Sequence, residues 1–404
     1  MWGDPNPKLD GTVHTHVIGE TGCGKSTLLL NLFSAYVRAG YGIALNDPNG
    51  DMAAMAMDLV PKGRLRDTVV VNPLAERVVG FNPLEGKNPE LRVENALGIL
   101  AHFYGTNSWL ARADYISRNL ALAVVKTIRN ATLFHITRAL VDDEYRAYVS
   151  KRSPSDFHLF FKAYDEKWPA KERETAAASP LNKFDLLNKP NIRAILGQSS
   201  GLNLREVLDR RKILFLSFPK GLLGEETTAL LSAIFTAGIT HAALERADTK
   251  FRPPFAFIMD EAQNNFRTNA VITLLTESRK YGITLIAAFQ TTTQIEPDML
   301  SILLGNTPNK LYYAVSAEDA QKLSPELGLA NPKMLVGLGR GYCYARLTRD
   351  GRKSSPLLIK TNPAPHLFGD ETTRDAVIRW SLSNHGTPRG IVDRGVNRIL
   401  KGGS

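Results

Sequence analysis

The chain has 404 residues, which is long for one compact domain, and its 43% hydrophobic and 22% charged residues exclude wholesale disorder. The formal net charge of +10 favours a polyanionic partner without indicating which one. The two cysteines, Cys23 and Cys343, form no C-x-x-C pair, which excludes that kind of zinc or redox site and indicates a reducing interior.

The first motif lies between a predicted strand, Val13 to Ile18, and a predicted helix, Ser26 to Arg38. Residues 19–26 read Gly-Glu-Thr-Gly-Cys-Gly-Lys-Ser and match G-x-x-x-x-G-K-[ST]. In such a loop the backbone N–H groups and the helix N-terminus meet phosphates, Lys25 reaches the β- and γ-phosphates, and the Ser26 hydroxyl holds Mg²⁺. The alternative is a chance match in a glycine-rich turn. The flanking strand and helix favour a nucleotide site.

An α/β pattern follows the first motif. Residues 42–45 predict a second strand, which ends in the turn-forming residues 46–51, and residues 68–71 predict a third. Strands that alternate with helices at this spacing predict a parallel sheet with both faces covered.

From about Val93 the apolar residues recur at helical rather than strand spacing. Residues 113–128 form an amphipathic helical pattern, and further helical stretches cover 136–150, 155–168 and 170–178, the last of which we expect Pro180 to end. An all-α insertion is therefore predicted. Whether it binds a partner or covers the core stays open, since a basic helix face is more often simply solvated.

Strand signals return after the insertion. The run 212–218 is continuously apolar, as in a buried parallel strand, and a long apolar helix follows at 225–244. Further strands are predicted at 255–259, 284–289, 311–315, 342–347 and 357–360, with a helix at 269–281 and another at 375–383. This order predicts four segments: the first part of the α/β domain (1–92), the all-α insertion (93–205), the second part of the α/β domain (206–362) and a tail (363–404).

The sequence also bears on location. No run approaches roughly 18 consecutive apolar residues, and the amino-terminal residues lack a signal-peptide pattern. We expect a cytoplasmic protein that does not insert into a membrane itself, so that partners would recruit it to the inner face of a membrane.

Two further motifs follow predicted strands. Asp260 and Glu261 end the apolar run 255–259, where phosphate-loop ATPases place a metal-binding acid and the base that deprotonates the attacking water. The alternative is a pair that caps the next helix. Gln290 ends the run 284–289, where an amide can touch a γ-phosphate and the attacking water. The alternative is a strand-end residue that bonds local backbone.

The order of these segments and the sequences of their motifs resemble those of the HerA/FtsK superfamily of ring-shaped DNA translocases. The similarity is greatest to the branch that holds the coupling-protein ATPases of conjugative type IV secretion, and it covers residues 12 to about 361. The segments that carry it are Asp47-Pro-Asn-Gly-Asp51, Val79-Gly-Phe-Asn-Pro-Leu84, Phe257-Ile-Met-Asp-Glu-Ala262 and Arg279-Lys-Tyr-Gly-Ile283, followed by Gln290. The resemblance implies a RecA-like P-loop NTPase that assembles as a homo-hexamer, with ATP at subunit interfaces and DNA in a central channel.

The resemblance also implies site residues. Nucleotide binding falls to Thr21, Gly22, Cys23, Gly24, Lys25, Ser26 and Thr27, Mg²⁺ binding to Ser26 and Asp260, and catalysis to Lys25, Glu261, Gln290 and Arg279. Arg279 matches the arginine that such proteins offer to a neighbour's γ-phosphate, although an arginine near a helix end is often a cap for the last carbonyls.

Three functions remain open from the sequence. The first is a hexameric translocase that moves DNA, single- or double-stranded, independently of its sequence, with a relaxase or secretion complex as partner. The second is a HerA-like helicase that works with a nuclease in DNA end processing or phage defence, or a viral genome packager. The third is a nucleotide-gated adaptor for protein cargo. Membrane coupling proteins begin with transmembrane helices and HerA proteins with a β-barrel; here we expect a natural minimal motor or one trimmed to that core.

Several other residues carry weaker signals. His14 and His16 have no ligand partners nearby in the sequence and are expected to be ordinary strand histidines. Lys220 and Arg340 are candidates for lining a DNA channel. The basic residues of the tail, such as Arg389, are expected to be a solvated end.

Overall fold

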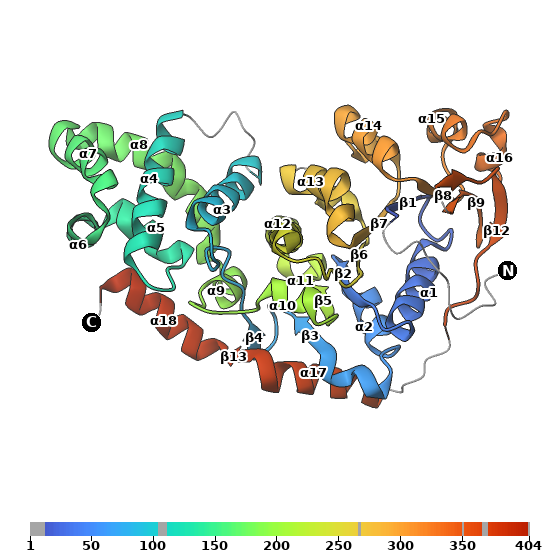
Figure 1. Ribbon diagram of the computed structural model, residues 1–404, viewed down its shortest axis with the longest axis horizontal. Helices are drawn as coiled ribbons and strands as arrows, with labels where there is room; N and C mark the ends of the chain where they lie inside the picture. The colour runs from blue at the N-terminus through green and yellow to red at the C-terminus, as the bar shows by residue number, and fades with distance from the viewer. Residues whose placement is uncertain (1–12, 104–110, 266–267, 350, 366–370, 403–404) are drawn as a thin grey trace. The chain divides into compact units, whose positions relative to one another are not determined.

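The computed structural model describes residues 13–103, 111–265, 268–349, 351–365 and 371–402. The chain forms two compact units (Figure 1). The sheet unit comprises Met1–Val71 with Leu204–Ser381, and the helical unit comprises Asn72–Asn203 with Leu382–Ser404. The units divide the chain after Val71, Asn203 and Ser381, whereas the sequence placed the divisions after residues 92, 205 and 362.

The sheet unit is built on a nine-stranded sheet in the order β12-β9-β8-β1-β7-β6-β2-β5-β3. The strands are β1 Thr15–Ile18, β2 Gly42–Asp47, β3 Thr68–Val71, β5 Ile213–Ser217, β6 Phe255–Met259, β7 Ile283–Phe289, β8 Asn309–Tyr312, β9 Tyr342–Arg346 and β12 Leu357–Lys360. All pairs from β8 to β3 are parallel, while β9 pairs antiparallel with β8 and with β12. The predicted α/β class with a mostly parallel sheet is confirmed.

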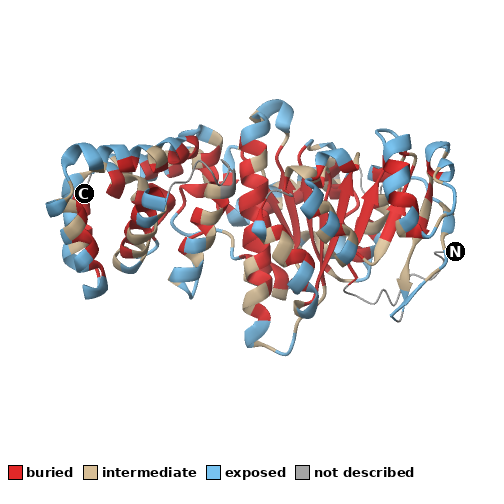
Figure 2. Cartoon of the chain, turned by 90° about the horizontal axis from the view of Figure 1, so that it is seen from above, coloured by how far each residue is buried: buried red, intermediate tan, exposed pale blue. Residues whose placement is uncertain are grey.

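The central strands are buried along their whole length, as the continuous apolar runs predict. Figure 2 shows these buried strands between helices. On one side α1 (Lys25–Arg38) and α2 (Asp51–Met57) contact each other and share a hydrophobic cluster with the strands. Elsewhere α12 (Glu225–Leu244) contacts α13 (Asn269–Glu277). The remaining helices of the unit are α10 Leu204–Asp209, α11 Lys220–Leu223, α14 Pro297–Asn306, α15 Ala317–Leu327 and α16 Lys333–Val336, and a small hairpin joins β10 Thr348–Arg349 to β11 Arg352–Lys353.

The register of the parallel strands aligns their carboxyl ends. Ile18 of β1 lies opposite Phe289 of β7, and Asn46 of β2 lies opposite Met259 of β6. Because the chain leaves each strand at this same edge, the residues that follow β1, β7, β6 and β2 lie side by side.

Helix α12 is the most apolar helix of the sheet unit. Among the described residues, the stretch Glu225–Asp248 alone is long and apolar enough to pass for a membrane span, and 83% of its apolar window is buried inside the protein. Such burial is what a core helix of a folded protein requires.

The helical unit contains α3 Pro89–Phe103, α4 Ala111–Thr127, α5 Leu133–Val141, α6 Asp143–Arg152, α7 His158–Phe161, α8 Ala170–Phe184 and α9 Pro190–Leu196. The predicted helix 136–150 is two helices, because Asp142 caps α6 by accepting a hydrogen bond from the Tyr145 N–H at 2.9 Å. The expected stop at Pro180 is wrong. Helix α8 continues through Pro180, and the packing of buried Ala176, Ala177 and Phe184 offsets the hydrogen bond that proline lacks.

The carboxyl-terminal residues form more structure than the helix that the sequence predicts at 375–383. Helix α17 covers Glu371–His385, and α18 covers Arg389–Lys401 within what was expected to be a solvated basic end. Helix α18 contacts α5 and α9 and buries Val392 and Val396. Between the two helices, β13 (Gly386–Pro388) pairs antiparallel with β4 (Arg77–Val79), so this segment is part of the helical unit.

Candidate functional site at the carboxyl edge of the sheet

The three sequence motifs meet at the carboxyl edge of adjacent strands. The phosphate loop follows β1, Gln290 follows β7, and Asp260 with Glu261 follows β6. Backbone hydrogen bonds continue the sheet into this edge: the Gly19 N–H donates to the Phe289 carbonyl at 3.2 Å, and the Asp260 N–H donates to the Asn46 carbonyl at 3.1 Å. The sheet therefore brings together residues that are far apart in the sequence.

The phosphate loop has the backbone that its glycines permit. Gly22 and Gly24 take φ values of 78° and 120°, which side chains other than glycine rarely adopt. Lys25 is buried, and its Nζ donates to the carbonyls of Gly19 and Glu20, the latter at 2.8 Å. Its Nζ also lies 4.0 Å from Cys23 Sγ, so its partners are atoms of the loop itself, from which the ammonium group can turn to phosphate oxygens.

The side chains around the start of α1 differ in their exposure. Helix α1 begins at Lys25, and Ser26 is exposed while Thr27 is half-buried. Cys23 is buried instead, and this burial raises the pKa of its thiol. The Ser26 hydroxyl is therefore accessible to a ligand, whereas Cys23 can contribute through its backbone.

A second loop supports the phosphate loop from outside the motif. The Gly341 N–H donates to the Cys23 carbonyl at 2.8 Å, and the Thr361 N–H donates to the Gly341 carbonyl at 2.7 Å. A Cβ placed on Gly24 would lie 3.4 Å from the Gly341 Cα. The exposed Arg340, a sequence candidate for a channel, therefore belongs to a turn that packs on the phosphate loop.

Asp260 lies near a second carboxylate, that of Asp47, which the sequence analysis assigned only to the predicted turn 46–51. Burial, with the charge of Asp47 adding to it, raises the pKa of Asp260 to about 6. Asp47 ends the adjacent strand β2 and accepts hydrogen bonds from the N–H groups of Asn49 and Ala53 at 2.9 and 2.8 Å. Two buried carboxylates that oppose each other's ionisation make a place where a cation is favoured.

Glu261 accepts three hydrogen bonds from side chains of other segments. The donors are Lys220 Nζ at 2.8 Å, Asn49 Nδ2 at 3.2 Å and Gln290 Nε2 at 3.3 Å. Partial burial alone would raise the pKa of Glu261, but the hydrogen bonds from Lys220 and Asn49 lower it. Glu261 itself has a φ of 44°, in the left-handed region that non-glycine residues seldom adopt. Its carboxylate is thus held ionised and directed toward Gln290.

Arg279 lies at the opposite end of β7 from Gln290. It belongs to the 3₁₀ helix Ser278–Tyr281, which directly precedes β7, and its side chain is exposed. Because β7 has seven residues, its two ends are about 20 Å apart. The fold therefore does not bring Arg279 to the phosphate loop of the same chain.

Comparison with known proteins places this arrangement in a family. The family model described as the type IV secretion-system coupling protein DNA-binding domain matches residues 3–333. The chain belongs to this family. The resemblance drawn from the sequence motifs is confirmed, and no curated protein sequence matches the chain.

Solved structures similar to this family member share its fold. The plasmid coupling protein TrwB in complex with ADP and Mg²⁺ superposes with a TM-score of 0.70 at 17% identity, over 90% of this chain and 89% of that one. VirB4 of Thermoanaerobacter pseudethanolicus superposes with a TM-score of 0.57 at 14% identity, over 87% of this chain and 90% of that one. At these identities the likeness shows the fold alone.

Two histidines, His16 in β1 and His14 just before it, are buried in the core, and among the described residues neither belongs to a metal-binding cluster. His16 bonds Thr307 Oγ1 at 2.6 Å and Tyr312 OH at 2.8 Å, and burial lowers its pKa to about 3. His14 Nδ1 accepts from the Leu285 N–H at 3.0 Å, and burial, with the charge of Arg279, lowers its pKa to about 4. Both rings are neutral at physiological pH.

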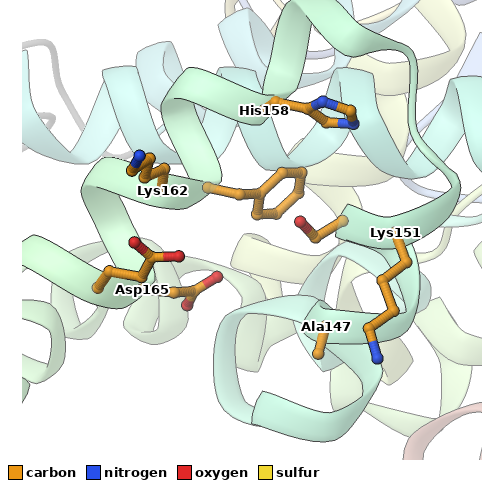
Figure 3. A pocket seen from close by; sticks show the side chains of 8 residues that line it. Ala147, Lys151, His158, Lys162 and Asp165 are labelled. Carbon is orange, nitrogen blue, oxygen red and sulfur yellow. The ribbon is translucent and has the colours of Figure 1, made fainter.

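The helical unit of this family member has a cavity of its own, separate from the motifs. It measures about 330 Å³. Figure 3 shows Lys151, His158, Lys162 and Asp165 around it. Arg146 holds Asp165 through a hydrogen bond from its Nε at 2.8 Å. The lining has two lysines and two carboxylates, so its charge does not favour a polyanion.

Proposed function

We propose that this chain is an ATP-driven DNA translocase of the conjugative coupling type. The observation that carries the proposal is the meeting of Glu261, Gln290 and the phosphate loop at one sheet edge, in a chain of the coupling-protein family. ATP is the substrate, and its hydrolysis drives the movement of DNA.

The residues at this edge fit a nucleotide with Mg²⁺. The related TrwB structure holds ADP and Mg²⁺, and in this chain the nucleotide would lie on residues 21–27, with Lys25 turning from its loop carbonyls to the phosphates. Ser26 is accessible, and Asp260 shares its buried surroundings with Asp47. Ser26 and Asp260 would therefore hold the ion. When bound there, Mg²⁺ would neutralise the charge that develops on the phosphate oxygens.

Glu261 acts as the general base. Lys220 and Asn49 keep its carboxylate ionised, so that it accepts the proton of the water that attacks the γ-phosphate. Gln290, which donates to Glu261 at 3.3 Å, orients the same water. An acid and an amide on neighbouring strands suit water as the nucleophile, which supports hydrolysis rather than transfer of the phosphoryl group to another molecule.

Arg279 completes the site of a neighbouring copy. It is exposed and lies at the far end of β7, so it can reach a γ-phosphate only on another subunit. This arrangement supports a ring with a nucleotide at each interface, and we propose a homo-hexamer with DNA in its channel. The net charge of +10 supports sequence-independent binding of the DNA backbone. The protein works in the cytoplasm, where a relaxase or secretion complex would deliver its DNA.

Electron microscopy with an ATP analogue and DNA, combined with ATPase assays, tests this proposal. We expect six-fold rings with density in the pore and an ATPase rate that rises when DNA is added and falls with increasing salt. A protein that stays monomeric under these conditions, or an ATPase rate that DNA does not change, would contradict the translocase function. Either result would favour the nucleotide-gated adaptor for protein cargo. Co-purification of a nuclease in place of a secretion complex would move the function to DNA end processing.

A further inference from the structure

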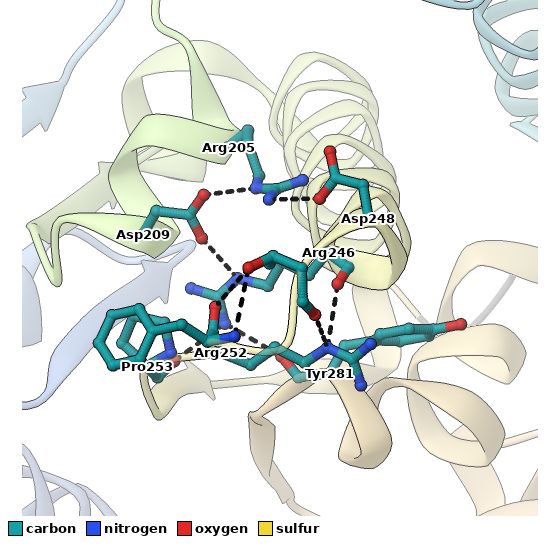
Figure 4. A network of polar contacts seen from close by, with 9 residues as sticks. Arg205, Asp209, Arg246, Asp248, Arg252, Pro253 and Tyr281 are labelled. Atoms are coloured by element: carbon teal, nitrogen blue, oxygen red, sulfur yellow. Dashed lines mark hydrogen bonds and ion pairs between the residues drawn. The ribbon is translucent and has the colours of Figure 1, made fainter.

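A fully buried guanidinium group lies at the amino edge of the sheet unit, away from the nucleotide site. Arg246 follows α12, and its side chain has 0% exposure. Its Nε–H donates to Asp209 Oδ1 at 2.9 Å, and its Nη1 donates to the carbonyls of Pro253 and Tyr281 at 2.9 and 3.0 Å (Figure 4). One side chain therefore ties together α10, the loop before β6 and the 3₁₀ helix before β7.

A second arginine binds the same 3₁₀ helix. Arg252 Nη1 donates to the Lys280 carbonyl at 2.8 Å, and its guanidinium lies 5.0 Å from the centre of the Tyr281 ring. Its Nε donates to the Arg246 carbonyl at 2.9 Å, which links the two arginines. The carbonyls of both residues that directly follow Arg279 are thus held by arginine side chains.

The backbone around Arg279 has little freedom for other reasons. The Gly282 N–H donates to the Arg279 carbonyl at 3.1 Å, and Gly282 has a φ of 81°, where a Cβ would lie 3.0 Å from the Arg252 carbonyl oxygen. Ser278 is fully buried, and its hydroxyl donates to the Leu274 carbonyl. The segment is fixed on both sides while Arg279 itself is exposed.

The charges of this network indicate that it does more than stabilise the folded protein. Arg205 pairs with Asp209 and Asp248, Arg246 pairs with Asp209, and the charge of Arg252, which binds backbone carbonyls, lies close to Arg246. Burying a guanidinium costs its hydration, and like charges nearby increase that cost. What the network provides is a defined position for the backbone that carries Arg279.

We infer that Arg246 and Arg252 are positioning residues for Arg279, which they fix in the orientation needed at the neighbouring subunit's nucleotide. This inference rests on the proposed function, in which Arg279 acts across a subunit interface. An arginine that stabilises a transition state must be placed closely, since a misplacement of about 1 Å can cost about 10²-fold in rate. The carbonyl bonds of the two positioning residues supply that placement.

The test compares three substitutions within the same network. Arg246→Lys keeps the charge and a partner in Asp209, but an ammonium group cannot bridge the Pro253 and Tyr281 carbonyls as the guanidinium does. Arg252→Lys, at a half-buried position, is the second variant and carries the test if Arg246→Lys does not fold. Arg205→Lys is the matched control, because Arg205 donates to Asp209 and Asp248 in the same network.

We expect Arg246→Lys and Arg252→Lys to lower kcat by about 10²-fold while the affinity for an ATP analogue stays within about twofold. Arg205→Lys should keep kcat within about twofold, even where its melting temperature falls as far as that of the test variants. Wild-type kcat in both test variants would overturn the inference. So would a loss of kcat in all three variants that follows their melting temperatures, because that pattern describes a structural network only.

Mixed rings separate this inference from the proposed function. An Arg246→Lys subunit keeps its own phosphate loop and Glu261, and a Glu261→Gln subunit keeps its own Arg279, so their mixture should regain up to about one quarter of the wild-type rate. The reference mixture combines Arg279→Ala with Glu261→Gln. If the reference mixture regains activity and the Arg246→Lys mixture does not, the inference alone is overturned. If the reference mixture stays inactive, the proposed action of Arg279 across the interface fails, and the positioning role fails with it.

Discussion

The two ends of β7 differ in what their side chains bind. At the carboxyl end Gln290 bonds Glu261, which Lys220 and Asn49 also hold, so that side chains from four segments face one another. At the amino end the side chains of Arg246 and Arg252 bind backbone carbonyls, and Arg279 is left exposed. One end therefore joins side chains within the chain, while the other end leaves Arg279 exposed, where under the proposed function it would serve a partner subunit.

The largest expected effect is at the amino end. Arg279→Ala should lower kcat by about 10³-fold or more, because an arginine finger stabilises the charge of the transition state. Its nucleotide affinity should stay near that of the wild type, since its own phosphate loop is unchanged. Lys280→Ala is the control, because Lys280 is also exposed, where its Nζ pairs with Glu277 at 3.2 Å and lies 5.1 Å from the centre of the Tyr281 ring. Equal losses of ATPase in the two variants would contradict a specific role for Arg279.

At the carboxyl end, Glu261→Gln should lower kcat by about 10²- to 10⁴-fold, as expected for loss of a general base. The amide keeps the size of the side chain, so the protein should fold and bind an ATP analogue, which calorimetry would measure. Glu318→Gln, an exposed change of the same chemistry on α15, should leave the ATPase unaltered. DNA-stimulated turnover that survives in Glu261→Gln would show that another group is the base.

A smaller effect is expected from the residue that holds the base. The pKa of Glu261 is lowered by Lys220 and Asn49 against the opposing effect of burial, so the active carboxylate is lost only as the pH falls through this lowered value. Lys220→Met removes one donor and its charge, so the acid limb of the kcat profile should move to higher pH. Lys212→Met changes a lysine at the other end of β5, where the partner is Asp67 at 3.7 Å, and should not move it. An unmoved acid limb in Lys220→Met would remove Lys220 from the site.

The smallest effect concerns stability near the amino ends of the strands. His14 and His16 are neutral in the fold, with pKa values lowered by burial to about 4 and about 3 from 6.5. Their contribution to stability is therefore complete above pH 6.5 and is lost as the pH falls, by up to about 1.4 kcal/mol per pH unit for each ring. His14→Gln removes one of these titrations, so denaturant unfolding between pH 6.5 and 4.5 should show a shallower fall. An unchanged slope would mean that other groups dominate acid unfolding.

The sequence predicted every strand of the large sheet, because continuous apolar runs such as 255–259 are typical of buried parallel strands. It missed β4 and β13, which are short and pair only after the chain has returned from a distant segment. Helix α18 was also missed, since Gly390 and Gly395 lower its intrinsic helix propensity and its stability comes from packing on α5 and α9. At Pro180 packing also outweighs local propensity, because helix α8 continues through a residue that was expected to end it.

In the candidate site too, the sequence predicted some of the residues and missed others. The phosphate loop, Asp260, Glu261 and Gln290 follow strands directly, so the edge rule for parallel sheets predicts their meeting. Lys220 and Asn49 contact Glu261 only through the folded sheet, and no spacing in the sequence indicates those hydrogen bonds. The turn that carries Arg340 packs on the phosphate loop from more than 300 residues away.

We propose that the two ends of β7 serve two different nucleotides. Mixing Arg279→Ala with Glu261→Gln tests it most directly, because each variant lacks what the other retains. We expect that neither variant alone hydrolyses ATP at a useful rate and that DNA-stimulated activity appears when the two are mixed. A mixture that stays as inactive as its components would contradict the claim.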